Sequence, residues 1–201
     1  MKVYELEQGT PEWFEAKAGK FTSSKFSDLF MAKTTKGWNG LINQVVFERL
    51  TGTTPESFSS DWMKRGTELE PNAREAYELA TFNKVRQVGF VEKDEWVGCS
   101  PDGLVGSDGM VEIKCPKFST LIDYHLTGKI PEDYYWQMQG GMYVCGRKWC
   151  DFYVWHPNLK PLLKRIEPVE ADVKILEFKL AEAIAEAKKR ISKIGGTGEK
   201  Y

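Results

Sequence analysis

The chain has 201 residues, of which 41% are hydrophobic, and its 28 basic and 29 acidic residues give a formal net charge of −1. This length suits one domain with a sizeable core, and the balanced charge excludes bulk electrostatic attraction as a basis for nucleic-acid binding. No apolar run approaches the roughly 20 residues that span a bilayer. Because the four cysteines form no CxxC pair and no signal peptide opens the chain, we expect a reduced, cytoplasmic protein.

Helices are expected along much of the chain, because apolar residues recur at helical spacing. Thr10 suits the N-cap of the first helix, and Pro11 suits its first turn. The expected helical segments are residues 11–19, a segment after Thr22, and residues 38–50, 65–81, 120–128, 132–144 and 171–194. A polar loop is expected over residues 53–60, and fraying over residues 195–201.

Short strands are expected between these helices, where β-branched and aromatic residues lie between turn residues. The expected strands are residues 87–92, 95–99, 110–115 and 149–155. The first three are joined by turns rich in Gly, Asp and Lys, and this pattern predicts an antiparallel meander. Together the elements predict one α/β domain over residues 1–201, with a central mixed β-sheet flanked by helices and a long C-terminal helix.

One segment, SPDGLVGSDGMVEIKCP, carries the strongest chemical signal and places Asp102 ahead of Glu112 and Lys114. Alternate strand residues face the same side, so Glu112 and Lys114 project together, and a hairpin would bring Asp102 beside Glu112. Two carboxylates and the main-chain carbonyl of Ile113 are hard oxygen ligands that suit Mg²⁺. Lys114 is left to orient or deprotonate a water nucleophile, or to stabilise the transition state of phosphodiester cleavage. The alternative is a turn-forming aspartate and an exposed ion pair.

Five separated blocks extend this signal, and they occur in the order QGTPEWFEAKAGKFTSS, RGTELEPNARE, GCSPDGLV, EIKCP and YYWQMQGGMYV. Through them, over roughly residues 8–155, the chain resembles the phage lambda exonuclease family of YqaJ-like viral recombinases, within the PD-(D/E)xK nuclease superfamily. The resemblance implies a restriction-endonuclease-like core. It also implies an alkaline-type exonuclease that processively degrades one strand of linear duplex DNA from its 5′ end. The resulting 3′ single-stranded tails would serve homologous recombination by strand annealing.

The resemblance further implies a centre for two metal ions, with Mg²⁺ as the expected metal and Mn²⁺ as an alternative. By analogy Asp102, Glu112 and the carbonyl of Ile113 hold the main ion, and Lys114 is the catalytic lysine. Glu70, in the block RGTELEPNARE, matches an additional acidic position that reaches the metals directly or through water. Without the family, Glu70 would be interpreted as a solvated helix residue.

The family's pocket for a terminal 5′ phosphate maps onto Lys17, Ser24, Ser100 and Gln137. Hydroxyl and amide donors bond phosphate oxygens, and the ammonium balances their charge. Position 17 departs from the family, in which arginine is usual, and a lysine lacks the planar bidentate fork of arginine. We therefore expect weaker recognition of the phosphate, or help from a neighbouring lysine.

Two further interpretations concern apolar residues. Met63 falls where the family places an apolar wedge that helps to part the strands at the entering end. The aromatic run over residues 134–136 precedes Gln137 on an expected helix, and we expect core packing rather than base stacking for it.

The expected partners are linear duplex DNA with a 5′-phosphate end, two further copies of the chain in a homotrimeric ring, and a single-strand annealing protein. A closed ring would reconcile tight, processive binding with a net charge of −1. The expected location is the cytoplasm of a bacterial host that expresses a phage or prophage gene, with no membrane contact. Two alternatives are an endonuclease with the same core, which would cut circular DNA, and a catalytically silent module that binds DNA ends.

Overall fold

The computed structural model describes residues 1–55 and 61–195, and it describes the backbone but not the side chains of residues 61–64. The helices are α1 (Pro11–Lys17), the 3₁₀ helix η1 (Ser23–Phe30), α2 (Lys36–Thr51), α3 (Asp61–Thr81), α4 (Phe118–Thr127), α5 (Glu132–Cys145) and α6 (Glu170–Ile194). The strands are β1 (Lys2–Tyr4), β2 (Phe21–Thr22), β3 (Val85–Arg86), β4 (Phe90–Glu92), β5 (Val97–Cys99), β6 (Gly103–Val105), β7 (Gly109–Lys114), β8 (Trp149–His156) and β9 (Leu159–Ile166). Among the described residues, no helix has the length and apolar character needed to cross a bilayer.

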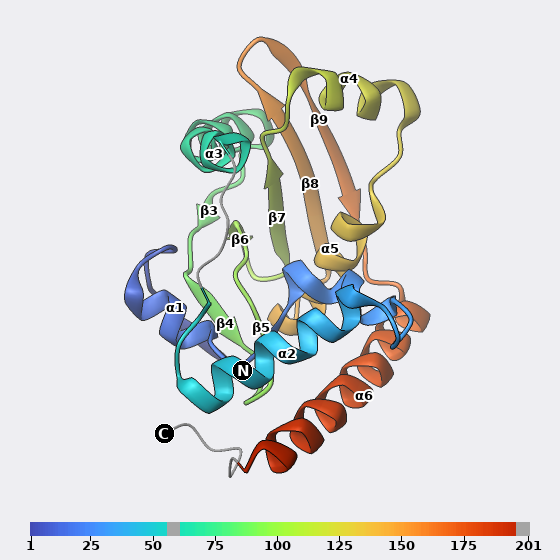
Figure 1. Cartoon of the computed structure of the whole chain (residues 1–201). Helices are drawn as coiled ribbons and strands as arrows, with labels where there is room; N and C mark the ends of the chain where they lie inside the picture. Colours follow the sequence, from blue (N-terminus) through green and yellow to red (C-terminus); the bar gives the residue numbers. More distant parts are fainter. Residues whose placement is uncertain (56–60, 196–201) are drawn as a thin grey trace.

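The larger sheet has the strand order β3-β6-β7-β8-β9, and its long strands β7, β8 and β9 lie side by side (Figure 1). β7 and β8 are parallel, whereas the other neighbours are antiparallel. Alternate residues of β7 divide between two cores: Val111 and Ile113 pack with Tyr77 of α3, and Met110 packs with Met138 of α5. Helices therefore cover both faces of this sheet.

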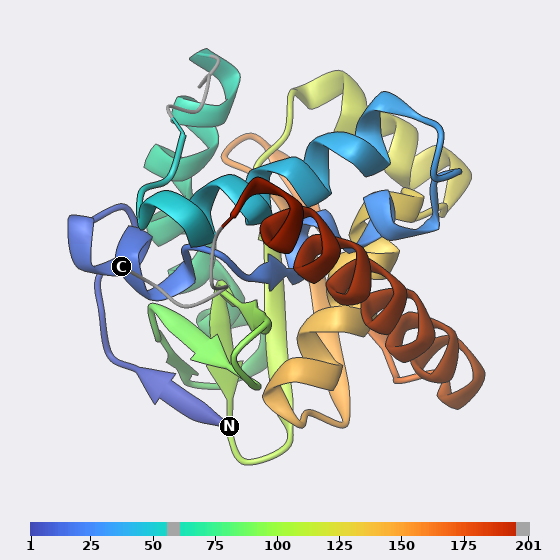
Figure 2. The ribbon, with the colours of Figure 1, turned by 60° about the horizontal axis from the view of Figure 1, so that its bottom comes forward.

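The smaller sheet has the strand order β1-β4-β5-β2. Its β2 pairs in parallel with β5, with Phe21 opposite Val97, while β1, β4 and β5 are antiparallel neighbours. At one end of the molecule α2 and α6 pack against each other, as Figure 2 shows. The apolar residues Leu176, Leu180 and Ala183 of α6 are buried in the larger core, which explains the helical spacing of apolar residues in that segment. The mixed α/β class, the flanking helices and the long C-terminal helix are confirmed.

The predicted helices are confirmed within a few residues, and their caps explain the boundaries. The side chain of Thr10 accepts a hydrogen bond from the amide of Trp13, and Pro11 occupies the first turn of α1. Gly52 ends α2 in the left-handed conformation that glycine adopts easily. The segment after Thr22 is helical as predicted, but as a 3₁₀ rather than an α-helix. Most of the predicted loop over residues 53–60, and nearly all of the predicted tail, lie outside the described residues.

The predicted antiparallel meander is confirmed only in its first half: β4 and β5 pair antiparallel, but the third strand does not continue this sheet. Residues 97–99 belong to the smaller sheet and residues 109–114 to the larger one, with β6 between them as the true partner of β7. β6 has only three residues, too few to show an alternating pattern in the sequence. β9 was not predicted either: the last expected strand covers residues 149–155, whereas the chain turns after His156 and pairs back onto β8.

Candidate active site

Asp102 lies just before β6, in the position that faces Glu112 on β7. Gly103 pairs with Val111 in the antiparallel β6–β7 ladder, so the residue before Gly103 comes opposite Glu112. The Oδ2 of Asp102 accepts a hydrogen bond of 2.7 Å from the backbone amide of Ile113. The structure therefore brings Asp102 and Glu112 together as predicted, through a hairpin with β6 rather than with β5.

Glu112 and Lys114 form a close pair on the same side of β7. The Nζ of Lys114 lies 2.5 Å from Oε1 of Glu112. Glu112 is only 1% exposed, which excludes the alternative of an exposed ion pair. The ammonium of Lys114 also lies 4.8 Å from the ring centroid of Tyr134 on α5. Tyr134 is half-buried against the core, as predicted for the aromatic run, but it also forms part of the wall around Lys114.

Glu70 reaches the site from α3, which packs on the larger sheet. Its carboxylate forms an ion pair with Arg74, one turn further along the helix. The hydroxyl of Tyr77 donates to Oδ2 of the buried Asp151 at 2.8 Å, and Arg165 donates two hydrogen bonds to the same carboxylate. Since Asp151 lies on β8 beside β7, this contact fixes α3, and with it Glu70, against the strands that carry the other carboxylates.

Burial and the charge of Asp102 shift the pKa values of the two neighbouring glutamates. Burial and the charge of Asp102 raise the pKa of Glu112, and separately that of Glu70, to about 7. Burial also raises the pKa of Asp102, against the opposing effect of Lys114. Burial alone would lower the pKa of Lys114, but the charges of Glu112 and Asp102 outweigh it and the net pKa is raised. The site thus concentrates negative charge that Lys114 and Arg74 only partly balance.

This concentration of oxygen ligands fits a hard divalent cation. Glu112 is buried with the Lys114 ammonium at its Oε1, and Mg²⁺ prefers carboxylate and carbonyl oxygens of the kind that Asp102, Glu112 and Ile113 offer. Among the side chains that the structure describes, no three from His, Cys, Asp or Glu gather into a ready-made metal cluster. A cation here would therefore depend on main-chain, water and phosphate oxygens, and on displacement of the Lys114 ammonium from Glu112.

Two cavities share the carboxylates Glu70 and Asp102 in their walls. One, of about 450 Å³, contains Lys114 and Tyr134, and the other, of about 510 Å³, contains Arg74 and Gln8. Both are also lined by Thr67, Glu70 and Asp102. Glu112 lines neither cavity, in keeping with its burial. A substrate on either side would thus meet Glu70 and Asp102 first.

A third, smaller cavity of about 170 Å³ brings together three of the four residues predicted to bind a terminal phosphate: Lys17, Ser24 and Ser100. We call it the anion pocket; Gln8, Trp13, Thr22 and Ser23 complete its wall. Burial lowers the pKa of Lys17, which lies on α1. Gln137, on α5, is not among the residues of this wall. Gln8 lines both the anion pocket and the larger cavity that contains Glu70 and Asp102.

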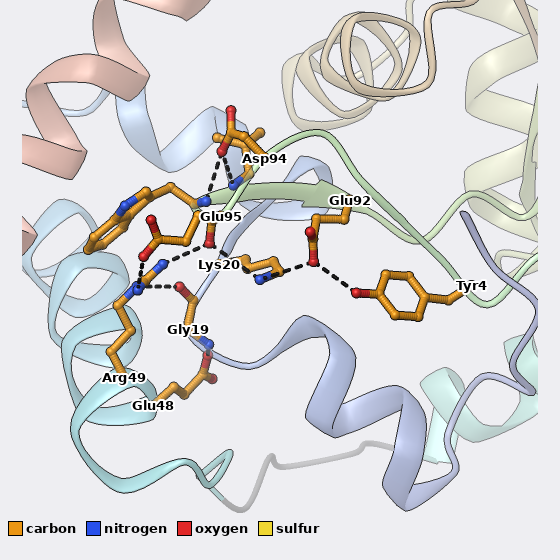
Figure 3. Close-up of polar contacts among 10 residues, drawn as sticks. Tyr4, Gly19, Lys20, Glu48, Arg49, Glu92, Asp94 and Glu95 are labelled. Carbon is orange, nitrogen blue, oxygen red and sulfur yellow. Dashed lines mark hydrogen bonds and ion pairs between the residues drawn. The ribbon is translucent and has the colours of Figure 1, made fainter. Parts of the chain in front are cut away.

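The turn after Lys17 is held by a buried polar network at the end of α2 (Figure 3). Oε2 of Glu48 accepts the amide of Gly19 at 2.7 Å, and Nε of Arg49 donates to the Gly19 carbonyl at 2.9 Å. Arg49 also donates to the backbone carbonyl and the carboxylate of Glu95, between β4 and β5. The network therefore ties the segment that follows Lys17 to the strand that leads to Ser100.

Sequence reasoning missed Trp13, Gln8 and Arg74 as site residues. Trp13 and Gln8 stand in the block QGTPEWFEAKAGK, and Arg74 follows Glu70 at the i,i+4 spacing that places two side chains on one helix face. That spacing was a usable signal for Arg74. The proposed wedge residue Met63 belongs to α3, but its side chain lies outside the described residues.

Comparison with known protein families assigns the chain. The YqaJ-like viral recombinase domain matches residues 12–148, which is more than half of the sequence. The chain belongs to this family. The family assignment confirms the resemblance drawn from the five sequence blocks. A comparison with curated proteins found no match.

Solved structures agree with this YqaJ-like assignment. An alkaline exonuclease from Laribacter hongkongensis, LHK-Exo, is 36% identical over 92% of this chain and 96% of its own, with a TM-score of 0.85. The same enzyme in complex with dAMP gives 37% identity over the same shares and a TM-score of 0.86. A phage-related exonuclease from Haemophilus somnus 129PT, at 14% identity, covers 88% of this chain and 96% of its own with a TM-score of 0.67, and shares the fold. The family and the match to an alkaline exonuclease support a nuclease activity on DNA.

Proposed function

We propose that this YqaJ-like chain is a metal-dependent 5′-to-3′ exonuclease that processively degrades one strand of linear double-stranded DNA. The observation that carries the proposal is the shared wall between two cavities. Gln8 borders both the anion pocket, with Lys17, and the cavity that contains Asp102. A single DNA strand could therefore place its terminal phosphate in the anion pocket and its scissile phosphodiester in the cavity that contains Asp102. This arrangement is expected for an enzyme that removes nucleotides from 5′ ends.

Asp102, Glu112, the carbonyl of Ile113 and Glu70 would hold the metal ions in this proposal, as two Mg²⁺ or Mn²⁺. Such ions supply Lewis-acid polarisation of the phosphoryl oxygens and a water of lowered pKa. Lys114 orients the attacking water or donates to a non-bridging oxygen of the scissile phosphate, because its ammonium already lies at the Glu112 carboxylate. Arg74 holds the Glu70 carboxylate in place beside Asp102.

The wider setting of the proposal is homologous recombination by strand annealing. Digestion from 5′ ends leaves 3′ single strands, which a single-strand annealing protein would coat. A net charge of −1 offers little bulk attraction for DNA, so we propose that three copies form a ring around the duplex. We place this activity in the cytoplasm of a bacterium that carries the gene on a phage or prophage.

The test is digestion of linear duplex DNA whose two strands are labelled separately at their 3′ ends. The ends carry a 5′ phosphate or a 5′ hydroxyl, covalently closed circles serve as a control substrate, and parallel reactions contain Mg²⁺ or EDTA. Lys114→Ala should lose about 10²- to 10⁴-fold in rate while it still binds DNA. Lys174→Ala is the matched control, because Lys174 lies on the exposed side of α6 with 69% of its side chain accessible.

Each result has a clear meaning. Loss of nucleotides from 5′ ends in Mg²⁺, with circles intact, supports the proposal. Cutting of circles would indicate an endonuclease with the same core. DNA binding without cleavage by the unmutated protein would indicate a silent end-binding module, and near-full activity of Lys114→Ala would remove the role given to that lysine.

A further inference from the structure

Trp13 stands in the wall of the anion pocket and contacts two of the predicted phosphate ligands. Its indole nitrogen lies 3.0 Å from Oγ of Ser100 and 2.9 Å from the backbone carbonyl of Gly89. Its ring centroid lies 4.0 Å from Nζ of Lys17, which is one helical turn further along α1.

The indole N–H determines how the Ser100 hydroxyl can act. An indole nitrogen is a donor only, and its one hydrogen is shared between the Gly89 carbonyl and Ser100, so Ser100 must accept in this contact. The hydroxyl then retains its own hydrogen to donate elsewhere, and Ser100 borders the anion pocket. Phosphate oxygens accept hydrogen bonds, so a hydroxyl held as a donor suits a phosphate better than one free to turn.

The ring acts on Lys17 in a complementary way. A cation–π contact positions an ammonium without neutralising it, whereas a carboxylate partner would cancel its charge. Among the side chains that the structure describes, no carboxylate forms an ion pair with Lys17. Burial lowers the pKa of this lysine, and the nearby charge of Lys25 lowers it further against the opposing effect of Glu48. An ammonium held in this state is available to an anion that enters the pocket.

We propose that Trp13 is a positioning residue for end recognition: its N–H holds Ser100 as a donor, and its ring holds Lys17, toward one terminal phosphate. This inference rests on the proposed exonuclease function, because it assumes that the terminal phosphate of a DNA strand enters the anion pocket. Trp13 would act through Ser100 and Lys17 and would not touch the scissile bond. It would thus offset part of the disadvantage of a lysine at position 17.

The test compares digestion rates on 5′-phosphate and 5′-hydroxyl ends of the same linear duplex. Trp13→Phe removes the N–H and keeps a ring for Lys17, and Ser100→Ala removes the hydroxyl. Trp38→Phe is the matched control, because this indole is buried in the core beside Arg190 and outside the anion pocket. Dissociation constants for both duplexes are measured in EDTA, where no cleavage is expected.

We expect Trp13→Phe to lower the phosphate-to-hydroxyl rate ratio about 10-fold, as loss of one hydrogen bond in a charged site would. The rate on hydroxyl ends should fall less than the rate on phosphate ends. The preference for phosphate ends in the EDTA measurements, taken as the ratio of association constants, should fall as well. The double variant should be no worse than Ser100→Ala alone, because Trp13 acts through that hydroxyl. Trp38→Phe should leave the ratio unchanged.

An unchanged ratio in Trp13→Phe, or a double variant that loses the product of both single effects, would overturn the inference and leave the exonuclease proposal standing. Equal rates on both ends in the unmutated protein would instead remove phosphate recognition, and the role of Trp13 with it. If Trp13→Phe fails to fold, Ser100→Ala provides the test. An unaltered phosphate-to-hydroxyl rate ratio in Ser100→Ala would contradict the proposal that Trp13 acts through the Ser100 hydroxyl.

Discussion

The backbone amide of Ile113 donates a 2.7 Å hydrogen bond to the carboxylate of Asp102, and so ties the turn before β6 to the strand that carries Glu112. The Asp102 carboxylate thus has two roles: it accepts this hydrogen bond, and it is a predicted ligand of the cation. The hydrogen bond needs only an oxygen at Asp102, whereas cation binding needs its negative charge. The two can be separated by substitution.

Asp102→Asn should keep the hairpin and lose the chemistry. The amide oxygen of asparagine can still accept from Ile113, and removal of one of three mutually repelling charges relieves the buried site. We expect an unchanged or higher Tm, and an apparent Mg²⁺ affinity lowered by more than the roughly 10- to 100-fold that outer-shell changes cost. Mg²⁺ titrations of digestion rate test this, with Asp108→Asn, at the exposed turn between β6 and β7, as the control. Unaltered Mg²⁺ dependence would argue against Asp102 as a ligand.

Metal-free protein should lose stability as the pH rises. The pKa of Glu112 and that of Glu70 are raised to about 7, from an ordinary glutamate value of 4.5. A carboxyl with a higher pKa in the folded state binds more protons when folded. Its contribution to the stability of the folded protein is complete below the ordinary pKa, and this contribution is lost as the pH rises through about 7. We expect Tm in EDTA to fall between about pH 5 and about pH 8, and added Mg²⁺ to reduce the fall.

Thermal denaturation followed by circular dichroism measures this dependence. Glu112→Gln is the matched variant, and its Tm should vary less with pH, because an amide does not titrate. A Tm in EDTA that rises over the same range would contradict the prediction.

Arg74→Met should impair the site through Glu70. Without the guanidinium, which lowers the pKa of Glu70, that pKa rises further and the carboxylate loses its ion-pair partner. The rising limb of the pH–rate profile should move to higher pH, and the rate at neutral pH should fall about 10- to 100-fold. Lys84→Met serves as the control, since Lys84 follows α3, is exposed, and pairs with Glu78 of that helix. A profile with the same midpoint as the parent would count against this role of Arg74.

Gly19→Ala should destabilise the protein more than Gly52→Ala. Both glycines have positive φ, at +71° and +70°, so both substitutions carry the left-handed penalty of about 1–2 kcal/mol. A Cβ at Gly19 would also lie 2.6 Å from Cγ of Arg49, whereas nothing lies within 4 Å of one at Gly52. We expect an additional loss of about 1–3 kcal/mol in the free energy of unfolding for Gly19→Ala. Denaturant unfolding measures the free energy of unfolding of both variants. Equal losses would show that the Arg49 side chain moves aside at little energetic cost.

The helices could be predicted from the sequence because their signals are local. The Thr10 cap, the Gly52 stop and the apolar seam of α6 each depend on residues within a few positions of one another. The pairing of Glu112 with Lys114 followed equally from strand alternation. The division into two sheets, and the strands β6 and β9, did not, because strand pairing depends on partners far away in the chain.

The sequence by itself determined the family, the helices and the residue types of the active site. Only the tertiary structure decided which side chains share a cavity. It placed Glu70 of α3 beside Asp102, joined Lys17 to Ser100 through Trp13, and left Gln137 out of the anion pocket wall. The physical reason is range: caps and periodicity act over one or two turns, whereas a site gathers residues whose proximity comes from burial of the whole core.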